Sequence, residues 1–274
     1  IEREIFRISD EVHVDIAHHS RKLYRQTHEL RLHPWMGPTL YGCKILYDPQ
    51  HFMDFTQASV RGQFYRPDKI LGRVRLQVEQ ARQLWLSFAS SKKNANIETA
   101  RAYLYAVGLI GNAIAGLTGK PLTERRFLIE FPKRAEAVGH AGLYAGLLGL
   151  LGGSLVDAAA ARAWLPAWRL TVENLPGDRR PPQLSLSRIP YYWRAFDVIL
   201  DSDQPMAVLW PLLRTWTKAV SFSKRDSSAR DQWNQAVNQL GLLGEAFPER
   251  VTALDAYLDQ VEELIDEWAR ENGA

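Results

Sequence analysis

The sequence is very poor in cysteine, since Cys43 is the only one among its 274 residues. An intrachain disulfide and a cysteine zinc site are therefore both excluded. A chain without disulfides suits a reducing compartment, so we expect a cytoplasmic protein. Residues 1–4 are charged and have no apolar stretch behind them, which is unlike a signal peptide.

The sequence also has no large excess of positive or negative charge. The chain has 34 Lys and Arg residues against 31 Asp and Glu residues, which gives a formal net charge of +3. This small balance gives no reason to expect specific nucleic acid or an anionic membrane as a partner. Residues 138–156 carry no formal charge, but they include six glycines. A membrane-spanning helix needs about 20 strongly apolar residues, so we interpret this segment as a buried helix pair broken near Gly152.

Common catalytic signatures are also absent. The sequence contains no phosphate-binding loop, dinucleotide fingerprint, nucleophile elbow or HExxH motif. Two weaker patterns are interpreted as structural. Arg134 and His140 have a spacing found in helical ribonucleases, but Gly139 interrupts it. Ser154 follows two glycines, far from the Asp pair at 201 and 203, and we expect it to be a helix N-cap.

The sequence does contain a cluster of histidines around one strand-like run. Six of its seven histidines lie in the first 51 residues: one falls within residues 11–17 and the other five follow that run. That run alternates with a period of two, so Val12, Val14 and Ile16 share one face, and His13 and Asp15 share the other. Burying a carboxylate in a strand is costly unless it is hydrogen-bonded, paired or bound to a metal. We therefore look for chemistry first at Asp15.

Several roles for Asp15 stay open at this point. A carboxylate on the open face of a sheet is typical of two-metal phosphoryl and nucleotidyl transfer, although at least one more carboxylate is needed. An iron or zinc site would instead use nearby histidines: His13, His18, His19 and His28. A purely structural role would pair Asp15 with a basic residue from a neighbouring strand: Arg3, Arg7 or Lys44.

Hydrophobic periodicity predicts an α+β chain that is mostly α, with a small mixed sheet edge at the N-terminus followed by a large helical bundle. Strands are expected at 3–8, 11–17 and 43–47. Helices are expected at 67–88, 97–118, 123–138, 140–151, 154–174, 188–201, 204–221, 227–244 and 249–271. We divide the chain into a sheet part at 1–62, a helical domain at 63–175 and a helical extension at 184–274, on either side of a linker at 175–182.

Two features of the helices make packing predictions. Helix 97–118 has only small residues at Gly108, Gly111 and Ala115. We therefore expect a neighbouring helix to approach it closely there. The nine tryptophans fall mostly on apolar helical stripes, so we expect them in the core.

The order of these segments resembles a known family. A strand with Asp15 near its centre, a polar connection, the run Ile45-Leu46-Tyr47-Asp48-Pro49 and a bundle of long helices look like the second half of a bacterial nucleotidyltransferase of the kanamycin or lincosamide type. The resemblance implies Mg²⁺-dependent transfer of a nucleoside monophosphate from an NTP, such as ATP, to a hydroxyl of a small-molecule acceptor. It implies that Asp15 is a catalytic residue and a metal ligand, with His13 in a supporting role.

The chain departs from the family in one respect. The Gly-Ser turn and the Asp-x-Asp pair, which bind the NTP and its magnesium in that family, are not in this sequence at the family's positions. Because the chain lacks an initiator methionine and begins within a strand-like pattern, we expect these motifs upstream of Ile1.

A second hypothesis keeps the architecture but not the reaction. The chain would then be a catalytically inactive helical module that binds a nucleotide or a partner protein, as in toxin–antitoxin-like pairs. The apolar stripes at 71–88 and 251–268 would serve as partner surfaces, and a homodimer stays open as an assembly. Release of pyrophosphate from ATP separates the two hypotheses.

Overall fold

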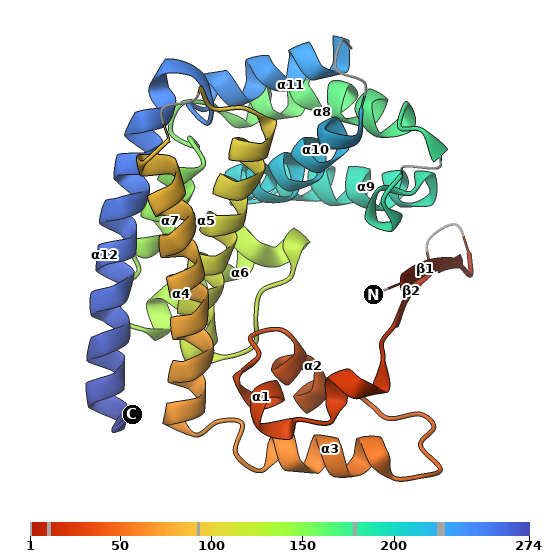
Figure 1. The fold of residues 1–274 in the computed structure, drawn as a ribbon. Helices are drawn as coiled ribbons and strands as arrows, with labels where there is room; N and C mark the ends of the chain where they lie inside the picture. The colour runs from red at the N-terminus through yellow and green to blue at the C-terminus, as the bar shows by residue number, and fades with distance from the viewer. Residues whose placement is uncertain (1, 10–11, 92–93, 178–179, 224–227) are drawn as a thin grey trace.

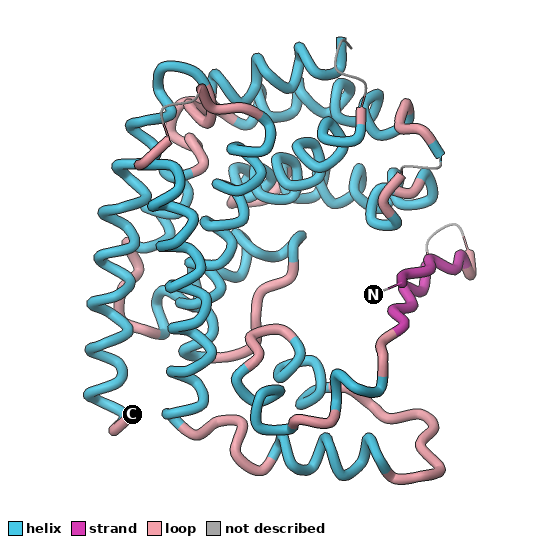
Figure 2. The backbone as a smooth tube through the Cα atoms, viewed as in Figure 1, coloured by secondary structure: helices cyan, strands magenta, loops and turns pink. Residues whose placement is uncertain are grey.

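The computed structural model describes residues 2–9, 12–91, 94–177, 180–223 and 228–274. It shows a small antiparallel hairpin at the N-terminus followed by a large assembly of helices (Figure 1), which confirms the predicted fold class. The hairpin consists of β1 (Glu2–Arg7) and β2 (His13–His18), and it is the whole sheet among the described residues. Helix dominates the rest of the backbone (Figure 2).

The predicted third strand at 43–47 is wrong. Residues 43–48 form a loop, in which the side chains of Leu46 and Tyr47 are about 85% exposed. An apolar run becomes a strand only where a neighbouring strand pairs with it and a core covers it, and here neither is provided. Three short helices that the sequence did not predict surround this loop: α1 (Thr27–Leu32), α2 (Met36–Gly42) and α3 (Phe52–Arg61).

The hairpin and these three helices form the part that we call the N-terminal unit. It has a small core of its own, made by Leu30, Leu40, Val60 and Phe64. A single larger core contains residues from both 63–175 and 184–274. The three-part division of the chain stays a prediction.

The remaining helices, which we call the helical body, are built around α5 (Ile97–Thr118). This helix is buried on nearly every side, and α4 (Pro67–Ala89) packs along it. In turn α12 (Phe247–Asn272) runs beside α4 (Figure 1). The predicted bounds of α4 and α5 are correct to within one residue, because Pro67 suits a first turn and Asn96 caps α5 by accepting from the Thr99 N–H.

The other helices of the body cross this layer, mostly at one end of it. Their bounds are α6 (Phe127–Ala137), α7 (Leu143–Leu150), α8 (Ala158–Glu173), α9 (Ile189–Leu200), α10 (Leu209–Phe222) and α11 (Ser228–Gln239). Ser154 does not cap α8 as predicted. Asp157 is the cap, and it accepts from the Ala160 N–H at 2.8 Å, because residues 151–155 are occupied by turns around Gly152.

Among the described residues, α5 is also the one helix long and apolar enough to cross a membrane by length and composition. In its most apolar window 72% of the residues are buried inside the protein. The core helix of a folded domain meets the same criterion.

Three tryptophans of the core share one hydrogen-bonding pattern, which supports their predicted place inside. Each is almost fully buried and donates its indole N–H to a buried threonine hydroxyl. The pairs are Trp168 to Thr215 at 2.9 Å, Trp216 to Thr171 at 3.0 Å, and Trp233 to Thr217 at 3.0 Å. These bonds fix α8, α10 and α11 against one another while leaving no indole N–H without a partner.

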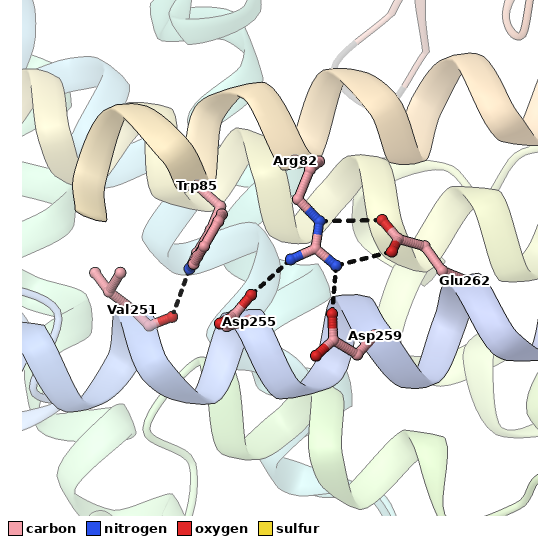
Figure 3. Close-up of polar contacts among 6 residues, drawn as sticks. All are labelled: Arg82, Trp85, Val251, Asp255, Asp259 and Glu262. Atoms are coloured by element: carbon pink, nitrogen blue, oxygen red, sulfur yellow. Dashed lines mark hydrogen bonds and ion pairs between the residues drawn. The ribbon is translucent and has the colours of Figure 1, made fainter. Parts of the chain in front are cut away.

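One arginine organises the seam between α4 and α12. Arg82 of α4 donates to three carboxylates that lie on successive turns of α12: Asp255, Asp259 and Glu262 (Figure 3). Hydrogen bonding to Glu262, and then to the other carboxylates, raises the pKa of Arg82 above its ordinary value. Nearby, Trp85 donates its indole N–H to the carbonyl of Val251 at 3.1 Å.

A second arginine joins the N-terminal unit to the helical body. Arg73 of α4 is only 6% exposed, and it donates to the carbonyl oxygens of Arg31 at 2.8 Å and Phe64 at 2.9 Å. Its guanidinium also lies 4.0 Å from the centre of the Phe64 ring. Burial lowers the pKa of Arg73 to about 10. The hydrogen bonds of its guanidinium therefore hold the group in place against the cost of desolvation.

We expect Arg82→Gln to lower the free energy of unfolding by about 1–2 kcal/mol, because three carboxylates of α12 lose a shared cation. The loss should shrink at high salt, which screens the remaining repulsion. Denaturant unfolding at low and high salt measures both effects. Arg75→Gln is the matched control: Arg75 lies on the same helix and pairs with Asp266 on α12, but both side chains are more than half exposed. An equal loss in both variants would contradict the central role of Arg82.

We expect Arg73→Met to loosen the N-terminal unit by about 1–3 kcal/mol, because two buried carbonyls lose their donor. Hydrogen exchange should therefore speed up in α1 and α3 while α5 and α10 stay protected. Arg66→Met is the control, since the Arg66 side chain is 61% exposed and pairs with Asp68. Unchanged exchange in α1 and α3 of the Arg73 variant would show that the joint does not depend on this guanidinium.

Candidate functional site

The two faces of the hairpin have opposite surroundings. The register places Ile5 opposite Asp15 and Arg7 opposite His13. Asp15 and His13 therefore share one face of the hairpin, as strand alternation predicts. This face is turned toward the helical body, where β1 packs against the short helix η4 (Pro182–Leu184). The other face carries Phe6, Val14 and Ile16, which are 65%, 40% and 38% exposed. The hairpin thus presents its polar face inward and its apolar face outward.

Asp15 is held between two guanidinium groups. Its Oδ2 accepts from Arg3 of β1 at 2.9 Å and lies 3.6 Å from Arg188, at the end of the short helix η5 (Leu186–Arg188). The carboxylate side chain is 26% exposed. The pairing with Arg3 is one that the sequence left open, whereas the contact with Arg188 joins the hairpin to the helical body. The two cations together offset the negative charge of Asp15.

His13 lies on the same face and enters a pocket of about 370 Å³ between the hairpin and α9. The pocket is lined mainly by Arg125, Tyr191 and Arg194, with the guanidinium of Arg125 stacked 3.9 Å from the centre of the Tyr191 ring. Nε2 of His13 is buried and has no hydrogen-bond partner among the described residues. His13 therefore keeps an uncommitted ring nitrogen in cationic surroundings.

Four of the other N-terminal histidines are used in local structure, and His28 lies in α1. His18 bonds to Glu4 at 2.8 Å, His19 to Tyr24 at 2.7 Å, and His51 to Asp54 at 3.0 Å. His33 accepts from backbone N–H groups at the start of α2. No group of three or more His, Cys, Asp or Glu side chains in the described part of the chain is placed to hold a metal ion. The iron and zinc alternatives thus find no supporting geometry.

A larger cavity of about 700 Å³ lies where the N-terminal unit meets the helical body. It is walled by α2, by α5, by the segment 120–124, by η4 and by α10. Three cationic side chains line it, Lys120, Arg214 and Lys218, against one acidic side chain, Glu124. We call it the cationic cavity.

The one carboxylate of this cavity is already engaged. Glu124 accepts from the buried hydroxyl of Tyr192 at 3.1 Å and lies 3.9 Å from Arg214. Burial, followed by the Glu124 charge, raises the pKa of Tyr192, so this hydroxyl stays a donor. Glu124 is thus the one carboxylate among the residues that line the cavity, beside three cationic side chains.

Lys218 is a half-buried cation of the cavity. Its ammonium donates to the amide oxygen of Gln183 at 2.9 Å, which is a neutral partner. Burial lowers the pKa of Lys218; Glu124 opposes the change, while Arg214, Arg3 and Arg101 add to it. Arg3, which pairs with Asp15, is therefore among the positive charges that disfavour the protonated ammonium of Lys218.

Aromatic side chains make the apolar wall. Trp210 stacks on Phe127 with ring centres 4.1 Å apart, and both rings sit over the low surface of α5. A Cβ added at Gly108 would lie 2.9 Å from Trp210, and one at Gly111 would lie 2.4 Å from Phe127. The predicted close approach at these glycines is confirmed, and it places the rings at the edge of the cavity.

The sequence reasoning missed this cavity. A signal was nevertheless present, because Trp210, Arg214 and Lys218 recur every four residues on α10 and so form one stripe on a helix whose other residues are largely buried. Asp201, which we considered with Asp203, pairs with Arg162 instead.

The hairpin pocket and the cationic cavity are lined by different residues, and η4, which β1 contacts, contributes Gln183 to the cationic cavity. Aromatic rings and cations face a space large enough for a small molecule. A search of protein-family models, curated proteins and solved structures finds no match to this chain.

Proposed function

We propose that this chain is a nucleotidyltransferase-like protein that transfers a nucleoside monophosphate from an NTP, such as ATP, to a hydroxyl of a small-molecule acceptor. The observation that supports this proposal is the position of Asp15, on the hairpin face turned toward a region rich in Lys and Arg. Nucleotidyl transfer needs a carboxylate that binds a divalent ion and cations that offset phosphate charge. Asp15 lies against the guanidinium groups of Arg3 and Arg188, so both kinds of group are present on this face.

The donor set decides which metal site fits. Mg²⁺ is commonly held by one or two carboxylates together with substrate phosphates and water, so Asp15 fits as one protein ligand of a Mg²⁺–NTP complex. It does not fit a two-metal centre by itself, and the described residues supply no cluster of acidic groups around it. When bound, Mg²⁺ would neutralise phosphate charge. Further carboxylates for a second ion would have to come from groups other than the described residues.

The protein's own residues have definable tasks in this proposal. Asp15 would exchange a guanidinium partner for the metal or for the acceptor hydroxyl, and the released Arg3 or Arg188 would then be available to phosphate oxygens. His13 would support the site by hydrogen-bonding through its uncommitted Nε2. Each task uses a group that the hairpin face already presents to the helical body.

One observation favours the second hypothesis, a module that binds a nucleotide or a partner without turnover. Asp15 already has two cationic partners, which satisfy the carboxylate without a metal. The apolar stripes at 71–88 and 251–268, expected as partner surfaces, are instead packed into the core. The exposed apolar residues of the hairpin would then serve contact with a partner protein. The two hypotheses share a binding region but differ in whether pyrophosphate is released.

We expect the protein to release pyrophosphate from an NTP when Mg²⁺ and a suitable hydroxyl acceptor are present. Asp15→Asn should reduce the rate by at least about 100-fold, because an amide is a poor ligand for Mg²⁺ and cannot accept a proton. A coupled pyrophosphate assay over the four NTPs and a panel of hydroxyl compounds measures this. Asp266→Asn is the matched control, since its side chain is 65% exposed on α12, away from the hairpin.

Two outcomes would contradict the proposal. Release at the same rate from wild type and Asp15→Asn would remove Asp15 from the reaction. ATP binding in equilibrium dialysis without release under any condition would favour the second hypothesis.

A further inference from the structure

The cationic cavity has the size and position of a ligand site. Its volume of about 700 Å³ falls within the range that small-molecule pockets occupy. Its walls come from α2 on one side and from α5 and α10 on the other, so it opens at the joint between the N-terminal unit and the helical body. A ligand here would contact both parts of the protein at once.

The charges of the cavity favour an anion. Lys120, Arg214 and Lys218 outnumber Glu124, and Glu124 already accepts from Tyr192. In the described part of the chain, Lys218 donates to a neutral amide oxygen, that of Gln183, rather than to a carboxylate. An ammonium held among other cations is stabilised by an arriving anion more than an isolated surface lysine would be. A cationic ligand would meet net repulsion in the same place.

The apolar wall favours a planar part on the same ligand. Tyr105 and Trp35, which line the cavity, are 44% and 40% exposed, so their rings present uncovered apolar area to it. Trp210 also lines the cavity, and the guanidinium of Arg214 is 5.4 Å from the centre of its ring. Aromatic surface beside a cation suits a flat group that carries its negative charge at one end.

We propose that the cationic cavity binds a small molecule with one anionic group, such as a phosphate, carboxylate or sulfate, and a planar apolar part. The anionic group pairs with Lys218 and Arg214, and the planar part packs against the aromatic wall. If the nucleotidyl transfer proposed above is correct, this molecule is the acceptor that carries the hydroxyl. The acceptor is then an anionic compound rather than a cationic one.

Phenyl phosphate is a probe with both features, and its binding can be measured by isothermal titration calorimetry on the full chain, without NTP or Mg²⁺. We expect it to bind, and benzylamine, which has the opposite charge, to bind at least about tenfold more weakly. Inorganic phosphate, which lacks the planar part, should also bind at least about tenfold more weakly than phenyl phosphate. Benzylamine that binds as well as phenyl phosphate would overturn the proposal, and inorganic phosphate that binds as well would overturn the role of the aromatic wall.

Variants locate the site. Lys218→Met should weaken phenyl phosphate binding at least about tenfold, whereas Lys218→Arg, which keeps the charge, should retain it within about threefold. Lys133→Met is the matched control, because Lys133 is exposed on α6 and its loss changes the net charge equally. Thermal melting confirms that each variant is folded. Binding that is unchanged in Lys218→Met would overturn the assignment to this cavity.

Competition between ATP and phenyl phosphate tests whether the cavity binds the nucleotide or a separate acceptor. ATP that fails to displace phenyl phosphate supports a separate acceptor site, whereas full displacement would identify the nucleotide as the occupant and overturn the acceptor assignment. Because the binding experiments contain no Mg²⁺ and need no turnover, failure to release pyrophosphate leaves their outcome unchanged. Conversely, turnover without phenyl phosphate binding would refute the anionic acceptor and leave nucleotidyl transfer standing.

Discussion

The buried guanidinium of Arg73 ties the N-terminal unit to the helical body through two carbonyl oxygens from separate parts of that unit. One carbonyl belongs to Arg31 in α1, and the other to Phe64, just before α4. Because the donors of a guanidinium have a fixed planar geometry, the two bonds define an orientation as well as a contact. The hairpin, which belongs to the same unit, contacts the helical body again at Arg188. Asp15 and the α2 wall of the cationic cavity both belong to the unit that Arg73 holds.

Asp15, the candidate catalytic residue, makes the second attachment of the N-terminal unit to the helical body. Asp15 bridges Arg3 of its own hairpin and Arg188 of the helical body, so its charge helps to hold the hairpin in place. A metal or a substrate hydroxyl would compete with these guanidinium groups for the same carboxylate oxygens. Binding chemistry and hairpin position are therefore coupled through one side chain. Arg73, which touches neither the carboxylate nor the cavity, keeps the joint in place on the other side.

The long helices could be predicted from the sequence, but most of the N-terminal unit could not. In α4 and α5 the apolar stripe, the proline at the first turn and the Asn96 cap all indicate the same helix, and local signals suffice. Residues 43–47 show the opposite situation, because a short apolar run fits a strand equally well and only a missing partner strand decides against it. The shared face of His13 and Asp15 followed from strand alternation alone. The contact with Arg188 joins positions 173 residues apart, and no local pattern contains it.

The walls of the cationic cavity illustrate why sequence reasoning could locate small residues but not their purpose. Gly108 and Gly111 were identified as low points on α5, yet the sequence does not say which side chains fill them. The structure places the Trp210 and Phe127 rings there, at distances that a Cβ on either glycine would obstruct. Because Trp210 is one member of the stripe that also carries Arg214 and Lys218, seating its ring fixes the rotation of α10 about its own axis. That rotation turns Arg214 and Lys218 into the cavity. The absence of side chains at Gly108 and Gly111, on the most buried helix, therefore determines where the positive charge of the cavity lies.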